Sequence, residues 1–342
     1  MSIQSSTVDL GFAEKCEPWK LESRLFPSKI GGKPAWLDLN NLPKCKDLQC
    51  DVCKQQMIFL CQIYAPHEED ENNFHRTIFI FVCKNSQCSI RNTNNNLKVF
   101  RSNLPRVNQF YSEEPPLEEP DLTFTLNKWV KLCNVCGCLA DKSCSKCKMG
   151  YCCREHQVID WKEGHKNECG SSLSDSRQSS LLFKEFELVI ESETEHSEEK
   201  DEKEAWREYK KLEMEGKVGT MVNTSEVELE AHAYVEEDTT FSKFRKRIER
   251  DPDQVIRYQR DGVPLWIADE PTLSEIPKCE LCNGPRQFEL QVMPQMLSVL
   301  GENELDWGTL VVYSCKSSCA DKVGYKIEFV FRQDVSDNKV NS

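Results

Sequence analysis

The pattern of apolar and polar positions predicts β-hairpins in two distant parts of the chain. Residues 57–64 and 75–82 are rich in apolar and aromatic types, and the polar stretch 67–73 between them is typical of a loop. A similar apolar run at 309–315 predicts a strand in the second half, and another strand is predicted at 181–190. The chain is therefore expected to be an α+β protein that is rich in β structure.

Residues 241–258 have a different pattern, in which apolar positions alternate with Lys and Arg at helical spacing. Pro252 interrupts the pattern, which predicts one amphipathic helix followed by a second short helix. Five basic residues form a dense patch in this region, namely Lys243, Arg245, Lys246, Arg247 and Arg250. We interpret the patch as a solvated helix face. Nucleic-acid contact is the alternative, but the patch lacks the interleaved aromatic residues that stack on bases.

An internal repeat relates the two β-rich regions. The turn sequence GKPAWL at 32–37 corresponds to GVPLWI at 262–267, and a C-x2-C pair follows each turn. Phe59 and Phe288 each lie six residues beyond the second cysteine of the pair, and Gln62 and Gln291 each lie nine beyond it. The repeat predicts two related β halves that pack on each other as one pseudo-symmetric unit, with the residues between them as an insertion.

Each predicted hairpin brings two pairs of cysteines to the same end, as in a zinc ribbon. We predict one metal site in each half, with the ligands Cys50, Cys53, Cys83 and Cys88 in the first and Cys279, Cys282, Cys315 and Cys319 in the second. The alternative is that these are unliganded core cysteines, because the spacing of the second pair in each set is looser and cysteine is common in cores.

A denser string of metal-type ligands lies between the halves. Its pattern is C-x2-C-x7-C-x2-C-x4-C-x3-H-x8-H-x3-C, and its members are Cys133, Cys136, Cys144, Cys147, Cys152, His156, His165 and Cys169. Eight ligands make two closed tetrahedral zinc sites, which leave no open position for catalysis. A segment of about 37 residues buries too little apolar surface to fold alone, so zinc is expected to supply its folding free energy. Cys138 and Cys153 fall outside the pattern, although Cys153 could compete with its neighbour.

Composition narrows the range of functions. The chain has 342 residues, 19 cysteines and a net charge of −13. The length indicates two or three domains, and no apolar run reaches the roughly 18 residues of a membrane helix. We expect a soluble, intracellular protein whose cysteines bind metal rather than form disulfides. The acidic charge argues against general nucleic-acid binding and favours a basic protein partner.

An acidic run separates the insertion from the second half. Residues 185–204 hold ten Asp or Glu against two Lys. Such a run is most often a disordered, solvated linker, and the functional alternative is an acidic surface that shields a basic partner. We therefore divide the chain into an N-terminal β-rich half (1–126), a finger (127–172), a strand with an acidic flexible linker (173–240) and a C-terminal β-rich half (241–342).

The finger resembles a MYND finger through its ligand spacing and the run YCCREH at 151–156, with Trp161 ahead of His165. The resemblance implies cross-braced ligands. One zinc ion would take Cys133, Cys136, Cys152 and His156, and the other would take Cys144, Cys147, His165 and Cys169. The commoner MYND pattern has cysteine where this chain has His156, which is a conservative change for zinc.

Nearly the whole chain resembles the programmed cell death protein 2 family. The resemblance rests on KIGGKPAWL at 29–37, QIYAP at 62–66, FHR at 74–76, NLPRVN at 103–108 and DWGT at 306–309, together with the repeat and the finger. We find no phosphate-binding loop, nucleophile elbow or dinucleotide fingerprint, so we expect no enzyme activity.

The resemblance implies a chaperone or adaptor that binds the small-subunit ribosomal protein S2 during or after its synthesis and supports 40S subunit biogenesis, in cytoplasm and nucleus. The finger would be either a docking module, which in other proteins binds proline-rich peptides, or a structural clamp between the halves. The alternative function is a nuclear adaptor whose finger recruits transcriptional or apoptotic regulators.

Overall fold

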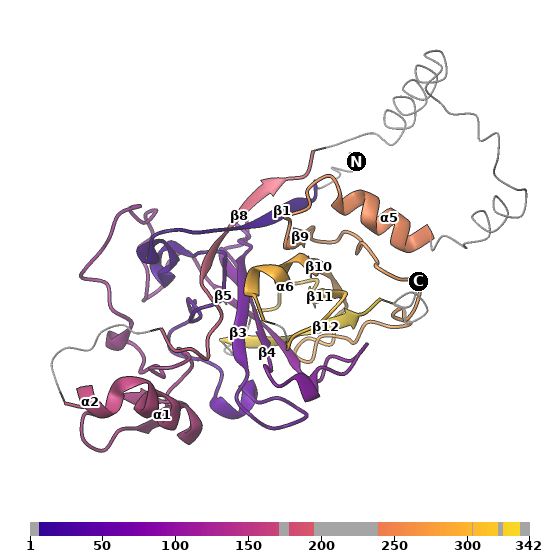
Figure 1. Cartoon of the computed structure of the whole chain (residues 1–342). Helices are drawn as coiled ribbons and strands as arrows, with labels where there is room; N and C mark the ends of the chain where they lie inside the picture. The colour runs from indigo at the N-terminus through magenta and orange to yellow at the C-terminus, as the bar shows by residue number, and fades with distance from the viewer. Residues whose placement is uncertain (1–6, 171–177, 195–238, 303, 321–323, 336–342) are drawn as a thin grey trace, which may run out of the picture.

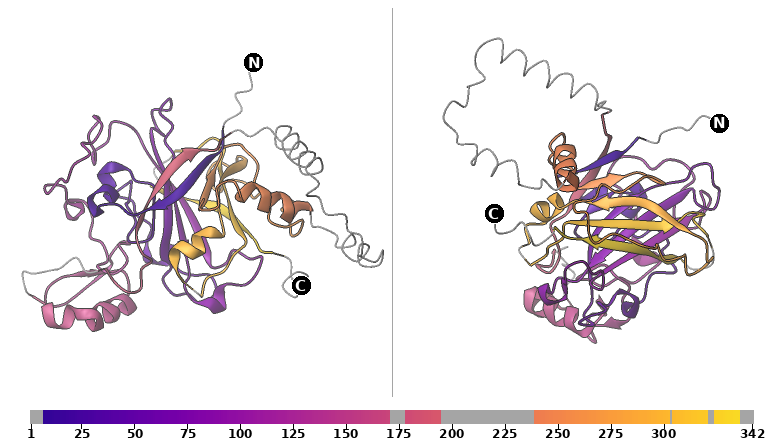
Figure 2. Two further views of the ribbon diagram at one scale, coloured as in Figure 1. Left: turned by 45° about the horizontal axis from the view of Figure 1, so that its top comes forward. Right: turned by 90° about the vertical axis from the view of Figure 1, so that its right-hand side faces the viewer.

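A closed barrel of ten described strands forms the body of the molecule, and a small finger with short helices lies beside it (Figures 1 and 2). The computed structural model describes residues 7–170, 178–194, 239–302, 304–320 and 324–335. The barrel strands are β1 (Asp9–Glu14), β2 (Lys29–Ile30), β3 (Ile58–Tyr64), β4 (His75–Val82), β5 (Leu97–Leu104), β8 (Phe186–Ser192), β9 (Ile256–Tyr258), β10 (Arg286–Val292), β11 (Thr309–Cys315) and β12 (Tyr325–Gln333). Their order around the barrel is β1-β8-β2-β3-β4-β5-β12-β11-β10-β9, and β9 pairs with β1.

Helices are few and short in the described residues. They are α1 (Arg154–Asp160), α2 (Lys166–Glu168), α5 (Thr239–Ile248) and α6 (Gln295–Leu300), with a π-helical turn (Trp161–His165) between α1 and α2 and short 3-10 turns in the connections. A two-stranded sheet of β6 (Lys142–Ser143) and β7 (Gly150–Tyr151) lies in the finger. No described helix is long and apolar enough to cross a membrane.

The predicted hairpins are confirmed. The run at 57–64 forms β3, that at 75–82 forms β4, and that at 309–315 forms β11. Every residue of β4 and of β11 is buried, so side chains on both faces of these strands are covered. Strands that are covered on both faces are continuously apolar rather than alternating, which is why these runs are distinct in the sequence.

The two halves join in one closed sheet, not in two sheets that pack face to face as the sequence predicted. The junction on one side is β5 with β12, which pair antiparallel from Tyr325 with Ser102 to Glu328 with Val99. On the other side β1 and β8 pair with each other and join β9 to β2. Joining the edges in this way satisfies backbone groups that two separate sheets would leave exposed.

Equivalent positions of the repeat have equivalent local structure. The register of β3 against β4 shifts between Phe59 and Cys61, and that of β10 against β11 shifts between Phe288 and Leu290. The side-chain oxygen of Gln62 accepts a hydrogen bond from the Ala35 amide and its nitrogen donates to the Ala35 carbonyl. The repeat alignment therefore predicted which residues occupy matching places at the start of each half.

One prediction for the region before the second half is wrong, and another is confirmed in part. The second short helix is absent from the described residues after Pro252, where β9 runs from Ile256 to Tyr258 and pairs with both β1 and β10. Val255 and Ile256 are fully buried, so pairing in the barrel overrides the helical spacing. The strand predicted at 181–190 is confirmed in part, because β8 covers Phe186–Ser192 and so includes the start of the acidic run. The rest of the run, from 195, lies outside the described residues.

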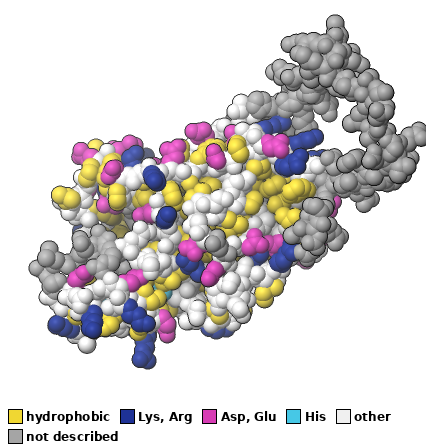
Figure 3. All heavy atoms as spheres, viewed as in Figure 1, with side chains coloured by type: hydrophobic (Ala, Val, Ile, Leu, Met, Phe, Trp, Pro, Cys, Tyr) yellow, Lys and Arg dark blue, Asp and Glu magenta, His cyan; other side chains and the backbone are white. Residues whose placement is uncertain are grey.

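The finger shares the main hydrophobic core of the barrel. Val130, Val135 and Tyr151 belong to the same buried cluster as the strand residues of β3 and β4. Trp36, which is fully buried, packs on Phe79 and donates its indole N–H to the Gly137 carbonyl at 2.7 Å. Trp36, in the turn at the start of the first half, thus fastens the first C-x2-C turn, or knuckle, of the finger. On the face shown in Figure 3, basic side chains gather over the finger, where Lys142, Lys146, Lys148, Lys162 and Lys166 are exposed.

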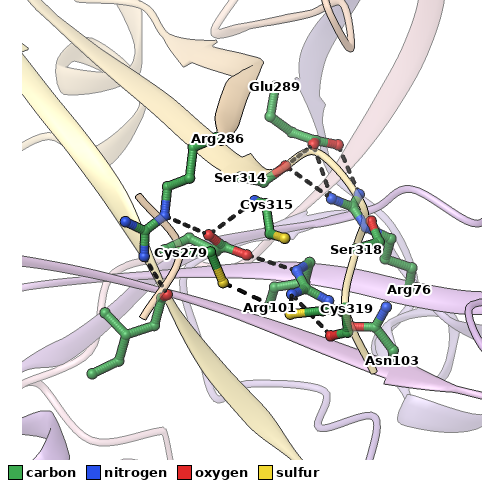
Figure 4. A network of polar contacts seen from close by, with 12 residues as sticks. Arg76, Arg101, Asn103, Cys279, Arg286, Glu289, Ser314, Cys315, Ser318 and Cys319 are labelled. Carbon is green, nitrogen blue, oxygen red and sulfur yellow. Dashed lines mark hydrogen bonds and ion pairs between the residues drawn. The ribbon is translucent and has the colours of Figure 1, made fainter. Parts of the chain in front are cut away.

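Buried ion pairs cross between the halves inside the barrel (Figure 4). Arg76 of β4 makes a bidentate pair with Glu289 of β10 at 2.7 and 2.8 Å, and both side chains are fully buried. The Ser314 hydroxyl and the Tyr258 hydroxyl also donate to this carboxylate. Burial raises the pKa of Glu289, but the Arg76 charge together with the hydrogen bonds from Arg76 and Ser314 outweighs it and lowers the pKa to about 2. The carboxylate therefore stays ionised beside its partner.

Candidate metal centres

Four C-x2-C pairs form the same tight turn, which is the building unit of every candidate metal centre. In each turn the residue four positions after the first cysteine has a positive φ and donates its N–H to the carbonyl of that cysteine. The N–H of the first cysteine in turn donates to the carbonyl five positions on. The positive-φ residues are Lys54, Gly137, Lys148 and Asn283, with φ values of 61°, 70°, 64° and 54°.

The finger brings its eight predicted ligands together as two clusters. One contains Cys133, Cys136, Cys152 and His156, and the other contains Cys144, Cys147, His165 and Cys169. Within each cluster the ligand atoms lie within 4.8 Å of one another. The first and third pairs thus share one centre and the second and fourth share the other, which is the cross-braced arrangement that the MYND resemblance implied.

Local structure in the finger aims the two histidines. His156 lies in the first turn of α1, and its Nδ1 is 3.2 Å from Cys152 Sγ and 3.7 Å from Cys133 Sγ. His165 follows a kink at Gly164, whose φ of 152° is readily adopted only by glycine. The kink turns His165 so that its Nε2 lies 3.4 Å from Cys147 Sγ.

Each barrel half brings its four predicted cysteines together in the same way. Cys50, Cys53, Cys83 and Cys88 form one cluster, and Cys279, Cys282, Cys315 and Cys319 form the other. The cysteine pair at the end of the second strand of each hairpin, β4 or β11, meets the C-x2-C turn that precedes the first strand, β3 or β10, so sulfurs from four chain positions converge. Cys282 is exposed, whereas the other seven cysteines of these two clusters are buried or half-buried.

The spacing of the sulfurs fits tetrahedral zinc. Zinc–sulfur bonds of about 2.3 Å in a tetrahedron place two sulfurs about 3.8 Å apart. The observed distances are 3.6 Å for Cys136 to Cys152, 3.7 Å for Cys144 to Cys169, 3.6 Å for Cys53 to Cys83, 3.5 Å for Cys282 to Cys315 and 3.7 Å for Cys279 to Cys319. A disulfide has an S–S distance of about 2.0 Å, so none of these pairs is a disulfide and all four clusters suit a metal.

Local hydrogen bonds favour the thiolate form that zinc requires. The backbone amide of Cys147, and then the side chain of His165, donate to Cys144 and lower its pKa to about 6. Burial raises the pKa of Cys315, but hydrogen bonds led by the Ser317 hydroxyl outweigh it and lower the pKa to about 6. The clusters that contain Cys144 and Cys315 therefore each hold a thiolate, which is a good zinc ligand, near neutral pH. Zinc bound there would act as a structural cross-link.

Asp160 supports the second finger centre from outside. Its Oδ2 accepts a hydrogen bond from the Tyr151 hydroxyl at 2.5 Å and from the Asn134 side chain at 3.1 Å. The same oxygen lies 4.0 Å from His165 Nδ1, the ring nitrogen that faces away from the sulfurs. A carboxylate on this side of a ligating imidazole helps to orient its ring. The sequence analysis missed Asp160, because no local pattern relates it to Tyr151.

Three of the cysteines outside the clusters, Cys61, Cys138 and Cys153, have packing or capping roles. Cys153 is the N-cap of α1, where its sulfur accepts the His156 N–H, so the thiol next to a ligand stabilises the helix that carries another ligand. Cys138 is buried beside the first knuckle and donates to the Cys136 carbonyl. Cys61 lies in the core of β3, where burial raises its pKa well above the usual range of thiols.

The fold and these centres define a class of protein: a closed β-barrel with cysteine clusters positioned to bind metal, into which a cross-braced zinc finger is inserted. Comparisons with known proteins identify the family. Models for the N-terminal domain of programmed cell death protein 2, for its C-terminal putative domain and for the MYND finger match residues 7–118, 238–334 and 133–169. None of these three models describes a catalytic domain.

Relatives extend over the full chain. It is 41% identical to programmed cell death protein 2 of Bos taurus across 98% of this chain and 99% of the relative. It is 27% identical to programmed cell death protein 2-like of Mus musculus across 85% of each chain. A shorter match, 34% identical over 27% of this chain and 28% of the relative, is to the probable 20S rRNA accumulation protein 4 of Schizosaccharomyces pombe. No solved structure matches the chain.

The chain therefore belongs to the programmed cell death protein 2 family, as its sequence motifs predicted. Its MYND finger is a zinc-binding domain, so zinc is a cofactor of the chain.

Proposed function

We propose that this chain is a zinc-stabilised chaperone that binds a basic ribosomal protein, the small-subunit protein S2, and supports assembly of the 40S subunit. Family membership and the name of the yeast relative, a probable 20S rRNA accumulation protein, support a role connected with ribosome production. Its place of action is the cytoplasm, with passage to the nucleus. It acts by binding and releasing its client rather than by catalysis.

The observation that carries this proposal is an acidic groove between the β1–β8 pair and α6. The groove has a volume of about 690 Å³. Four carboxylates line it, those of Glu14, Glu191, Asp251 and Asp253. No basic side chain is among the ten described residues of its lining, which also include Phe12 and Val299.

A basic, partly apolar segment suits this lining. Ribosomal proteins bind RNA phosphates through Lys and Arg, and without RNA those charges attract other polyanions. Carboxylates in a groove neutralise such charges, and the apolar side chains between them contact the aliphatic stems of Lys and Arg. The overall charge of −13 steers a basic client toward the molecule from a distance.

Affinity capture of the tagged full-length chain from growing cells, with mass spectrometry of its partners and of isolated translating ribosomes, tests the proposal. The groove variant carries Glu14→Gln, Glu191→Gln, Asp251→Asn and Asp253→Asn. Its matched control neutralises four exposed carboxylates elsewhere, those of Glu68, Glu69, Glu113 and Glu114. We expect S2 at near-stoichiometric yield with the wild type and the control, and several-fold less with the groove variant. Absence of S2 from the wild-type capture would overturn the proposal.

A second function has one observation in its favour. The finger exposes two large apolar side chains, Val158 and Trp161, at 41% and 43% of their full accessible areas. Exposed apolar groups on a rigid module suit binding of a short peptide. Under this alternative the finger recruits nuclear regulators through proline-rich segments. Replacing Trp161 by Ala should then remove nuclear partners while S2 capture persists.

We further propose that four zinc ions support this scaffold, two in the finger and one in each half, and that the halves are pseudo-symmetric in structure. The four knuckles with one turn geometry, and the equivalent contacts of Gln62 and Gln291, support both statements.

A further inference from the structure

The C-terminal cysteine cluster is bordered by a charged side chain that comes from the other half of the barrel. Arg101 lies on β5, and its Nη2 donates to the Cys319 carbonyl at 3.3 Å and lies 3.8 Å from Cys319 Sγ (Figure 4). The residue is fully buried. The sequence separation is 218 residues, so this contact exists only when the barrel is closed.

Glu328 links this arginine to the rest of the cluster. Its Oε1 accepts from Arg101 Nε at 2.7 Å, and its Oε2 accepts from Arg286 Nε at 2.9 Å and from the Cys315 amide at 3.1 Å. Arg286 also donates to the carbonyls of Pro277 and Lys278, which directly precede the first knuckle. The Glu328 carboxylate thus connects both cysteine pairs of the cluster to Arg101 on β5.

The charges beside this cluster favour a bound metal. Arg101 and Arg286 are both buried and share one carboxylate, that of Glu328, so these three side chains leave a surplus of one positive charge. Four thiolates around a divalent zinc ion carry a net charge of −2, which offsets that surplus next to Arg101. Four neutral thiols would leave the surplus without a partner, and a buried charge without a partner is costly.

We propose that Arg101 is an outer-shell positioning residue of a zinc site at Cys279, Cys282, Cys315 and Cys319, and that zinc binding there and closure of the β5–β12 junction stabilise each other. The second finger centre has its outer-shell partner, Asp160, within the finger itself. The C-terminal centre instead takes its partner from a different half. Its metal is therefore held tightly only in the closed barrel.

Release of zinc to a colorimetric chelator, measured on the full chain, tests the outer-shell role. Loss of an outer-shell partner typically weakens metal binding about 10–100-fold. We expect Arg101→Gln to make one zinc ion per chain that much easier to remove, while the others are retained as in the wild type. Arg101→Lys, which keeps the charge but loses the fork of donors, should have a smaller effect. Glu328→Gln, which keeps the shape of the carboxylate, should behave like Arg101→Gln and serves if that variant does not fold.

Arg257→Gln is the matched control. Arg257 is also buried and ion-paired, with Glu193 at 2.9 Å, but its hydrogen bonds go to Glu193 and Gln254 rather than to a cysteine. The Arg257→Gln variant should lower thermal stability without making any one zinc ion easier to release than the others. Release from Arg101→Gln that matches the wild type, or that matches Arg257→Gln, would overturn the outer-shell role.

Hydrogen exchange tests the coupling to the junction. In Cys282→Ser, which lacks one ligand, we expect amides of β5 and β12 to exchange at least tenfold faster, and unchanged exchange there would overturn the coupling. The inference rests on the proposed zinc at this cluster. If Cys282→Ser retains the wild-type zinc content, zinc binding itself is wrong, whereas reduced content with normal release from Arg101→Gln contradicts only the role of Arg101.

Discussion

Gln62 and Gln291 make the same pair of hydrogen bonds in the two halves of the barrel. Gln62 brackets Ala35, with its oxygen 2.9 Å from the amide and its nitrogen 3.2 Å from the carbonyl. Gln291 brackets Leu265 at 2.9 and 2.6 Å. Both glutamines are buried, and each fastens the turn of its half to a barrel strand. A buried amide that satisfies both polar groups of one residue fixes the backbone there.

Replacing either glutamine by Ala should destabilise the protein to a similar extent. Each change leaves a backbone amide and a carbonyl without a partner, and each such group costs about 1–3 kcal/mol where it is buried. Chemical denaturation measures the free energy of unfolding. Gln55→Ala, an exposed position, is the control and should change it by less than about 0.5 kcal/mol. A loss in only one half would show that the two turns are not equivalent.

The zinc content should be four ions per chain, measured by inductively coupled plasma mass spectrometry on protein purified without chelators. Cys53→Ser and Cys282→Ser should each reduce the content by one ion, because each removes a ligand from a different cluster. Cys16→Ser changes a half-buried cysteine outside the clusters and should leave the content at four. Two ions in the wild type would restrict metal to the finger.

Arg76 and Glu289 should contribute to the free energy of unfolding in a non-additive way. Arg76→Met leaves a fully buried carboxylate without its bidentate partner, so we expect a loss of about 3–5 kcal/mol. The double change to Met at both positions should recover part of that loss, because no charge is left unpaired. A double-mutant cycle by urea denaturation measures this difference. Additive effects of the two single changes would contradict the interpretation.

Trp36→Phe should loosen the finger. The indole N–H is lost while the ring stays, so the buried Gly137 carbonyl loses its donor at a cost of about 1–3 kcal/mol. Hydrogen exchange should rise within 133–138 more than in β3. Trp266→Phe is the control, since that ring occupies the matching position of the repeat but packs on Phe331 instead. Equal exchange in both variants would contradict an anchoring role of Trp36.

His75 should make stability depend on pH. Burial, followed by the Arg106 charge, lowers the pKa of His75 from 6.5 to about 4. The unfolded chain binds a proton near pH 6.5 and the folded chain does not, so the contribution of His75 is complete above pH 6.5 and is lost as the pH falls toward 4. We expect about 2 kcal/mol of this loss between pH 7.5 and pH 5. His75→Gln should show a correspondingly smaller decrease over the same interval, with zinc-ligand protonation common to both proteins.

Local spacing made the metal ligands predictable. A C-x2-C pair encodes one turn, so Cys133 with Cys136 and Cys279 with Cys282 were recognisable without a structure. The turn itself was less visible, because Lys54 and Lys148 occupy positive-φ positions where glycine would have been the signal. The repeat register succeeded for the same reason as the knuckles, since Phe59 and Gln62 are separated from Cys53 by short, ungapped intervals.

Long-range pairing could not be predicted. Arg101 and Glu328 are 227 residues apart, and nothing in the sequence near either residue indicates the other. The pairing of β5 with β12 likewise joins segments that are far apart in the sequence. Because of this pairing, the halves form one sheet rather than two. Ile256 shows the limit of periodicity, because its helical spacing from Phe244 and Ile248 was genuine but its pairing with Gly11 and Val292 determined its structure.

Closure of the sheet limits how the proposed chaperone can bind a nascent protein. Many proteins that handle unfolded chains accept them as an additional strand along an open sheet edge, and such contacts read the backbone of any sequence. In the described barrel, β9 pairs with β1 and β5 pairs with β12, so both seams where an edge would lie are occupied. For the proposed chaperone, this leaves side chains to recognise the client, so we expect binding that is selective for a basic client and sensitive to salt.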